Sequence, residues 1–189
     1  MPAHSQRHVL WQRLDAPGWE HLRLTGDNHG TLADGLVISV ENQQVFRLRY
    51  HVRCDSQWQC LGAELELVDE PKTKLVLKKK PGHDWVRNGK DIAGTRDCID
   101  IDIAATPFTN TLPIRRLGLR RGQAAEISAL YVQVPDFSAI VVRQKYRCLR
   151  ELNEYTYQGL DGREYRVKVD AEGLVSDYEG IFRRVWGAS

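Results

Sequence analysis

The chain has 189 residues, of which 42% are hydrophobic and 28% are charged, and its formal net charge is +2. These proportions are ordinary for a globular protein, and the small net charge gives no reason to expect nucleic acid or an anionic membrane surface as a partner. We therefore expect a single domain over residues 1–189 that buries a substantial core.

No apolar run approaches the ~20 residues that span a bilayer, and residues 1–14 lack the apolar segment of a signal peptide. The chain has four cysteines without a CxxC pair, at Cys54, Cys60, Cys98 and Cys148. This pattern argues against a zinc site and a disulfide framework, and the six histidines show no metal-ligand spacing. We expect a cytoplasmic chain with no transmembrane segment, no metal and no other cofactor.

Alternation of apolar and polar residues with a period of two dominates the chain, and helical periodicity is nearly absent. The alternation is clearest in residues 45–54, where Leu48, Tyr50 and Val52 share one face and arginines occupy the other. The predicted strands, in chain order, are residues 9–14, 19–24, 36–40, 45–54, 61–68, 74–79, 98–103, 114–119, 126–134, 140–148 and 165–169.

Turn signals separate these strands. Asn88-Gly89 and Asp161-Gly162 are pairs typical of two-residue type I′ hairpin turns. Roughly a dozen strands at this spacing predict one all-β antiparallel domain, either a sandwich or a barrel. A long sheet must curl or close to remove its edges, and a closed barrel of more than about eight strands can leave a cavity. Two packed sheets would leave none.

Residues 98–117, CIDIDIAATPFTNTLPIRRL, form the most informative stretch. It begins as a strand with Asp100 and Asp102 on one face, and a second strand is predicted after a turn-rich segment. We expect Arg115 to be buried with the apolar side of that second strand and Arg116 to be solvated. A buried guanidinium needs a carboxylate or a bound anion, so the stretch is either an internal ion-pair network or the polar end of a ligand cavity.

Other candidates lie outside this stretch. Trp58 and Trp85 are near turns, where an indole could line a cavity mouth or simply pack in the core. Gln144 and Tyr146 bring polar groups to an apolar strand face, either bonded to one another or pointed at a ligand. No aromatic residues interleave the arginines of residues 45–53, so no nucleic-acid track is expected.

Three stretches carry a resemblance to a known family: residues 98–117, YVQVPDFSAIVVRQKYRCL at 131–149, and VDAEGLVSDYEGIF at 169–182. Together with residues 45–58, they resemble bacterial proteins labelled as glycolipid-binding. The resemblance covers most of the chain and implies a curled antiparallel β-barrel or β-roll, similar to the lipoprotein carriers LolA and LolB and the lipid-binding protein LppX.

Three functional hypotheses remain open, of which the third is a purely structural or protein-interaction module. In the first, the protein is a non-enzymatic binder of a small amphipathic molecule, a glycolipid or another lipid, whose hydrocarbon part lies on the inner apolar face that includes Leu48, Ile140 and Val142. The candidate ligand-binding residues are Tyr50, Trp58, Trp85, Asp100, Asp102, Asn110, Arg115, Gln144 and Tyr146. In the second, the protein is an enzyme acting on a sugar-containing or lipid-like substrate, with Asp100 and Asp102 as an acid/base pair.

Overall fold

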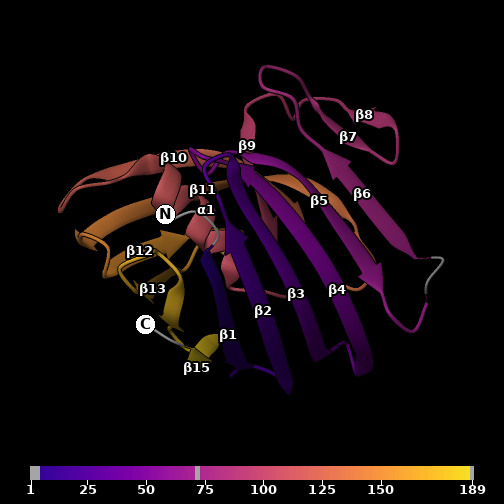
Figure 1. The fold of residues 1–189 in the computed structure, drawn as a ribbon, viewed down its shortest axis with the longest axis horizontal. Coiled ribbons are helices and arrows are strands. Elements are labelled where there is room, and N and C mark those ends of the chain that lie inside the picture. Colours follow the sequence, from indigo (N-terminus) through magenta and orange to yellow (C-terminus); the bar gives the residue numbers. More distant parts are fainter. Residues whose placement is uncertain (1–4, 71–72, 188–189) are drawn as a thin grey trace.

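The computed structural model describes residues 5–70 and 73–187. Residues 1–4, which belong to the segment 1–14 where no signal peptide was expected, lie outside the described residues. The described residues form one curled 15-stranded sheet (Figure 1). The strands, in chain order, are β1 (Ser5–Arg13), β2 (Gly18–Gly26), β3 (Gly30–Glu41), β4 (Gln44–Asp55), β5 (Cys60–Leu67), β6 (Lys74–Lys78), β7 (Trp85–Arg87), β8 (Lys90–Ile92), β9 (Cys98–Ile103), β10 (Ala124–Val132), β11 (Ala139–Arg150), β12 (Glu154–Gln158), β13 (Glu164–Val169), β14 (Val175–Tyr178) and β15 (Phe182–Gly187).

The order of strands across the sheet places the first and last strands side by side. It runs β8-β7-β6-β5-β4-β3-β2-β1-β15-β14-β13-β12-β11-β10-β9. Every neighbouring pair is antiparallel except β9 and β10, which are parallel. The predicted all-β curled fold is confirmed, and each predicted strand except residues 114–119 corresponds to an observed one. The sheet does not close into a barrel.

Side chains, rather than strand pairing, join β7 near one end of the sheet to β9 at the other. The indole Nε1 of Trp85 in β7 donates a hydrogen bond to the carbonyl of Cys98 in β9 at 2.8 Å. Beside it, Lys79 Nζ donates to the carbonyls of Thr95 at 3.0 Å and Arg96 at 2.8 Å. Trp85 is therefore a buried part of the fold and not the rim of an opening, which corrects the expectation that it flanks a cavity mouth.

The predicted strand over residues 114–119 is wrong. The chain instead forms a 3-10 helix, η1 (Phe108–Asn110), and a short α-helix, α1 (Thr111–Leu117), which ends at Gly118 with a left-handed φ of 54°. A parallel pair of strands needs a crossover connection, and η1 and α1 supply it between β9 and β10. A short apolar run is consistent with either a strand or a buried helix. The alternation in residues 114–119 therefore predicted a strand where the chain forms a helix.

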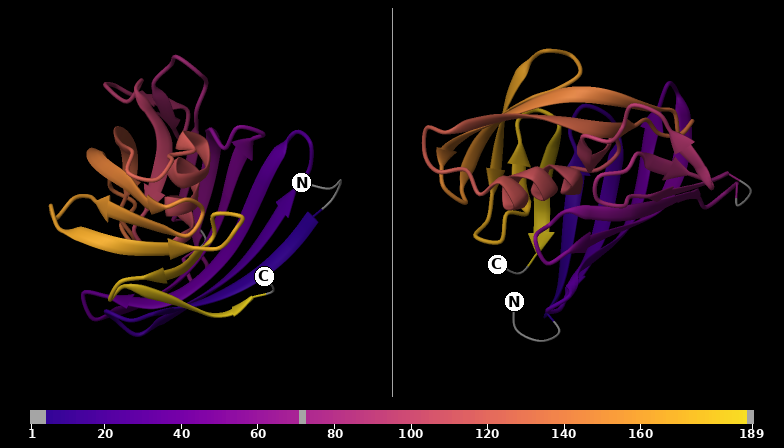
Figure 2. Two further views of the ribbon diagram at one scale, coloured as in Figure 1. Left: turned by 90° about the vertical axis from the view of Figure 1, so that its left-hand side faces the viewer. Right: turned by 90° about the horizontal axis from the view of Figure 1, so that it is seen from above.

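The helical crossover fills the inside of the curled sheet (Figure 2). Phe108 and Leu112 pack in the core formed mainly by β1–β7, β9 and β10, while Ile114 packs in a second cluster formed by β11–β15. Leu48 of the predicted hydrocarbon-binding face is consequently fully buried in packed core. Ile140, expected on the same inner face, is exposed at the beginning of β11.

The two predicted hairpin turns have different outcomes. Asn88 and Gly89 both have positive φ, 47° and 84°, as a type I′ turn between β7 and β8 requires. Between β12 and β13 only Gly162 has a positive φ, 70°, and the loop spans residues 159–163. The Asp161-Gly162 turn is thus longer than the two residues predicted.

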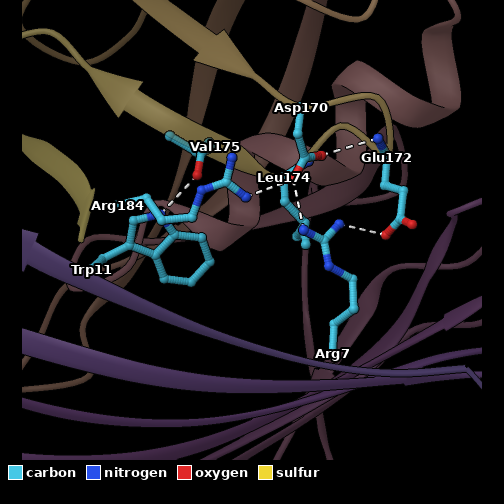
Figure 3. A network of polar contacts seen from close by, with 7 residues as sticks. All are labelled: Arg7, Trp11, Asp170, Glu172, Leu174, Val175 and Arg184. Carbon is cyan, nitrogen blue, oxygen red and sulfur yellow. Dashed lines mark hydrogen bonds and ion pairs between the residues drawn. The ribbon is translucent and has the colours of Figure 1, made fainter. Parts of the chain in front are cut away.

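Charged side chains tie the β13–β14 turn to the middle of the sheet. Asp170 in this turn accepts hydrogen bonds from Arg7 of β1 at 3.0 Å and from Arg184 of β15 at 2.6 Å (Figure 3). Nearby, the indole Nε1 of Trp11 donates to the carbonyl of Val175 at 2.8 Å. These bonds hold the turn against the two strands that contain the ends of the described chain.

A carboxyl group is buried in the core without a cationic partner. Oε1 of Glu20 in β2 accepts hydrogen bonds from Tyr50 Oη at 2.5 Å and Thr106 Oγ1 at 2.8 Å. Oε2 has no hydrogen-bond partner among the described residues. Burial raises the pKa of Glu20 from 4.5 to about 8, although the hydrogen bonds from Tyr50 and Thr106 lower it. The folded protein therefore holds Glu20 as a neutral acid near pH 7.

This burial predicts a pH-dependent stability that Glu20→Gln removes. Above pH 4.5 the unfolded chain ionises Glu20 while the folded chain keeps it protonated until pH 8 or so. Stability contributed by the neutral form is therefore complete below pH 4.5 and is lost as the pH rises towards about 8. Between pH 5 and 8 the wild type should lose about 3–4 kcal/mol relative to Glu20→Gln. Urea unfolding of both proteins at the two pH values measures the difference, and parallel pH profiles would contradict it.

Candidate functional site

A cleft of about 530 Å³ opens inside the curl of the sheet. Its lining comes from the β1–β2 and β3–β4 turns, the chain after β9, and the strands and loops of the C-terminal half. Among the residues that line it are Arg13, Asp15, Glu41, Asp102, Thr106, Asn110, Tyr131, Asp136, Tyr157, Asp161, Tyr165 and Tyr178.

Asp102 of β9 is held in the cleft by three donors. Its Oδ2 accepts hydrogen bonds from Gln144 Nε2 at 2.6 Å and Tyr157 Oη at 3.4 Å, and its Oδ1 accepts one from Thr109 Oγ1 at 2.9 Å. Burial raises the pKa of Asp102, while the hydrogen bonds from Thr109, Gln144 and Tyr157 lower it. The carboxyl group is fixed in orientation by η1, β11 and β12 together.

A second layer of polar groups supports the lining. Tyr146 Oη lies 3.1 Å from Asn110 Oδ1 and 3.4 Å from Gln144 Oε1, and its single proton is shared between these two acceptors. Gln144 and Tyr146 are buried and do not themselves line the cleft, whereas Asp102 and Asn110 do. Both β11 residues therefore act as positioning residues. The sequence left two interpretations of Gln144 and Tyr146, a bond between the two or contact with a ligand. These are compatible, because the two side chains bond to each other and also orient Asp102 and Asn110, which line the cleft.

Tyrosine rings form one wall. The rings of Tyr157 and Tyr178 meet edge to face with centroids 5.9 Å apart, and those of Tyr165 and Tyr178 with centroids 5.6 Å apart. Tyr131 of β10 joins the lining. The sequence alternation placed Tyr165 on a strand, but nothing in the pattern showed which strand faces would meet at the cleft, so these four tyrosines were missed.

Tyr131 provides a hydroxyl that is available for a ligand. It makes no hydrogen bond with any other residue of the described chain. Burial, with a smaller contribution from the charge of Asp102, raises the pKa of Tyr131 to about 12. The hydroxyl therefore stays protonated at neutral pH and can donate a hydrogen bond, near a carboxylate that can accept one.

The lining is strongly acidic. It contains five carboxyl groups, those of Asp15, Glu41, Asp102, Asp136 and Asp161, and one cationic side chain, that of Arg13. Arg13 donates hydrogen bonds to Asp15 at 2.8 Å and to Glu41 at 3.1 Å, so its charge is already matched within the protein. An anion in this cleft would meet an excess of negative charge.

The predicted site residues separate into two groups. Asp102 and Asn110 line the cleft and Gln144 and Tyr146 support it, as described above. The others lie outside its lining: Tyr50, Trp58, Trp85, Asp100 and Arg115. Because Asp100 does not line the cleft, Asp100 and Asp102 do not face a common substrate there.

The arginine that forms an ion pair in this stretch is Arg116, with Asp100, and not Arg115, which corrects the sequence prediction. Arg116 binds both carboxylate oxygens of Asp100, with Nη2–Oδ2 at 2.5 Å and Nε–Oδ1 at 3.1 Å. Arg115 instead lies over the ring of Trp58, 5.4 Å from its centroid. The prediction assumed the alternate faces of a strand, whereas successive residues of a helix are about 100° apart.

The chain belongs to the family described as "Putative glycolipid-binding", whose family model matches residues 8–184. It is also similar to the crystal structure of a DUF1089 family protein from Pseudomonas aeruginosa, with 34% sequence identity and a TM-score of 0.78. That match covers 89% of this chain and 92% of the other. No curated protein matches the chain. The expected likeness to the LolA, LolB and LppX carriers stays a prediction.

Within residues 5–70 and 73–187, no helix has the length and apolar character needed to cross a membrane. In the same part of the chain, no three histidine, cysteine, aspartate or glutamate side chains gather where they could hold a metal ion. The described cysteines, Cys54, Cys60, Cys98 and Cys148, are free and buried.

The corrected ion pair predicts unequal effects of two neighbouring substitutions. Arg116→Ala leaves the buried Asp100 carboxylate unpaired and should cost about 3–5 kcal/mol of unfolding free energy. Arg115→Ala removes a stacked guanidinium and should cost about 1 kcal/mol. Urea denaturation of the two variants makes the comparison. Equal losses, or a larger loss for Arg115→Ala, would contradict the assignment.

Proposed function

We propose that this family member binds the sugar head group of a glycolipid in the tyrosine-lined cleft and carries out no reaction on it. The observation that carries the proposal is Asp102, a carboxyl group oriented by three donors within a cleft bordered by tyrosine rings. Ligand sites of this kind combine apolar and aromatic walls with a few well-placed polar groups. The family description supports a glycolipid as the ligand class.

The polar groups suit adjacent sugar hydroxyls. An ionised carboxyl group has about four acceptor positions, and the protein occupies three on Asp102. One acceptor position therefore remains for a ligand hydroxyl, while the Tyr131 hydroxyl can donate to a neighbouring one. The faces of the tyrosine rings offer apolar surface to the C–H groups of a sugar ring.

The charge of the lining favours a neutral head group. Arg115, which the sequence suggested as a binding group for phosphate, lies over Trp58 instead. The only guanidinium of the lining, Arg13, is paired with Asp15 and Glu41. A phosphate or a uronate would therefore be repelled without gaining a partner, whereas an uncharged hexose would not meet this repulsion.

Substitutions at two polar groups test the head-group site with octyl β-D-glucoside as the probe. Wild-type protein should bind it saturably in calorimetry below the micelle concentration. Asp102→Asn removes a charged acceptor and should weaken binding about tenfold or more. Tyr131→Phe removes a hydroxyl that bonds nothing in the protein, so it should fold normally and weaken binding about threefold to tenfold.

The control for this experiment is Asp177→Asn. Asp177 lies on β14, is paired with Arg183 and does not line the cleft. This variant should bind the glucoside as the wild type does. Absence of binding by the wild type, or wild-type affinity in Tyr131→Phe, would count against the proposal.

Charge selectivity gives a separate prediction. Octyl β-D-glucuronide carries a carboxylate where the glucoside has a hydroxymethyl group, so repulsion by the lining should weaken its binding about tenfold at low salt. Raising the salt concentration to 0.5 M should narrow the difference, because the cleft is open to solvent and its charges are screened. Calorimetric titrations at two salt concentrations measure both effects. Tighter binding of the glucuronide would show that the acidic lining does not face the head group.

A further inference from the structure

An apolar groove of about 600 Å³ lies beside the cleft, on the other side of the β1–β2 and β3–β4 turns. Its apolar lining comprises Leu14, Pro17, Trp19, Ile38, Val40 and Val45. Three of these side chains are far more exposed than their size and polarity lead one to expect: Trp19 is 53% exposed, Ile38 48% and Val45 69%.

Strand pairing brings these side chains together on the outer face of the sheet. Trp19 of β2 pairs with Ile38 of β3, and Val40 of β3 pairs with Val45 of β4. Single exposed apolar residues on a protein surface are common, but apolar side chains that together line a hollow form a candidate binding site. The groove therefore offers apolar surface to a ligand.

The groove adjoins the cleft, because Arg13 and Asp15 line both of them. The edge between the two is well fixed, because Ser39 Oγ donates a hydrogen bond to the carbonyl of Pro17 at 3.1 Å and the Val40 amide donates to the same carbonyl at 3.2 Å. A molecule that fills the cleft would reach the groove by passing over Arg13 and Asp15.

We propose that the groove holds the hydrocarbon chain of the ligand whose sugar occupies the cleft, with the glycosidic linkage passing over Arg13 and Asp15. This inference rests on the proposed function. The inner apolar face offers no alternative place for the chain, because Leu48 and Val52 are buried in packed core. The ligand thus lies with its sugar inside the curl of the sheet and its chain on the outer face.

A chain-length series tests the proposal with methyl, hexyl and octyl β-D-glucosides as probes, each below its micelle concentration. Full burial of a methylene corresponds to about fourfold in affinity, so a groove that covers half of the chain should give about twofold per methylene. Affinity should therefore rise from the methyl to the octyl compound. Methyl glucoside, whose substituent is too short to reach the groove, gives the reference affinity of the head-group site.

Trp19→Ala should remove most of the gain between the methyl and octyl compounds. The matched control is Trp186→Ala, because Trp186 on β15 is 57% exposed but does not line the groove. This control should keep the full chain-length dependence. Because both side chains are exposed, both variants should fold. Octyl glucoside should also shift the tryptophan fluorescence of the wild type to shorter wavelength, and Trp19→Phe should abolish that shift.

The outcomes separate this inference from the proposed function. Equal affinity for all three glucosides overturns the groove but leaves the head-group site intact. Chain-length dependence that persists in Trp19→Ala also overturns the groove. Wild-type affinity of Asp102→Asn for all three glucosides overturns the head-group site and leaves the groove.

Two other occupants of the groove, a bilayer and a second copy of this chain, would give different results with the same variant. If Trp19→Ala leaves glucoside affinity unchanged but abolishes co-sedimentation with phosphatidylcholine vesicles, the groove contacts a bilayer and the proposal is overturned. If the same variant instead converts a dimer to a monomer in analytical ultracentrifugation, with glucoside affinity unchanged, a second copy covers the groove and the proposal is overturned.

Discussion

The parallel pairing of β9 and β10 is the constraint on which the rest of the structure depends. All other neighbouring strands in the described sheet are antiparallel, and those that follow one another in the chain need only short turns, but this pair requires a crossover. η1 and α1 form the crossover, and they lie on the inner side of the curled sheet (Figure 2). Buried residues of the crossover, among them Phe108, Leu112 and Ile114, then divide the interior into two packed clusters. A sheet of this length could have enclosed an open apolar cavity, and the crossover prevents it.

The functional consequence is a polar cleft inside the curl of the sheet and an apolar groove on its outer face. Because the interior is filled, the hollow that remains inside the curl is lined by Asp102, Asn110 and tyrosines, while the exposed apolar side chains gather beyond the turns at Trp19 and Ile38. An amphipathic ligand fits this arrangement with its polar part inside. Lipid carriers with an apolar cavity would hold their ligand the opposite way round, so a likeness to such carriers in fold does not by itself decide how a ligand is held.

Sequence patterns predicted most of the strands and part of the candidate site, and the predictions that failed did so for physical reasons. Period-two alternation identified the faces of β4 and β11, because burial on one face of a sheet dictates it. The same alternation failed at Ile114 and Arg115, where a seven-residue helix is too short to display its own period. It therefore paired the wrong arginine with Asp100. The tyrosine wall was out of reach for another reason, since it forms only when β10 and β12–β14 come together in the curled sheet. Polar residues on apolar strand faces remained the most useful signal, because a buried Gln144 or Tyr146 must find a partner.

In the proposed binding mode the cleft and the groove contribute differently. Asp102 has its donors in place without a ligand, so the proposed head-group site is preorganised and little conformational entropy would be lost on binding of a sugar. Thr106 at its border is fixed in the same way, donating to the buried Glu20 and accepting from the Phe108 amide. Hydrogen bonds in such a site favour a sugar with one arrangement of hydroxyl groups. A sugar with another arrangement leaves buried polar groups unpaired, and this difference makes the site selective. The groove, with exposed side chains and no polar partner for a hydrocarbon, discriminates only by length, because apolar burial is non-directional. Head group and chain would thus contribute specificity and affinity separately, and a change in one site should leave the preference set by the other intact.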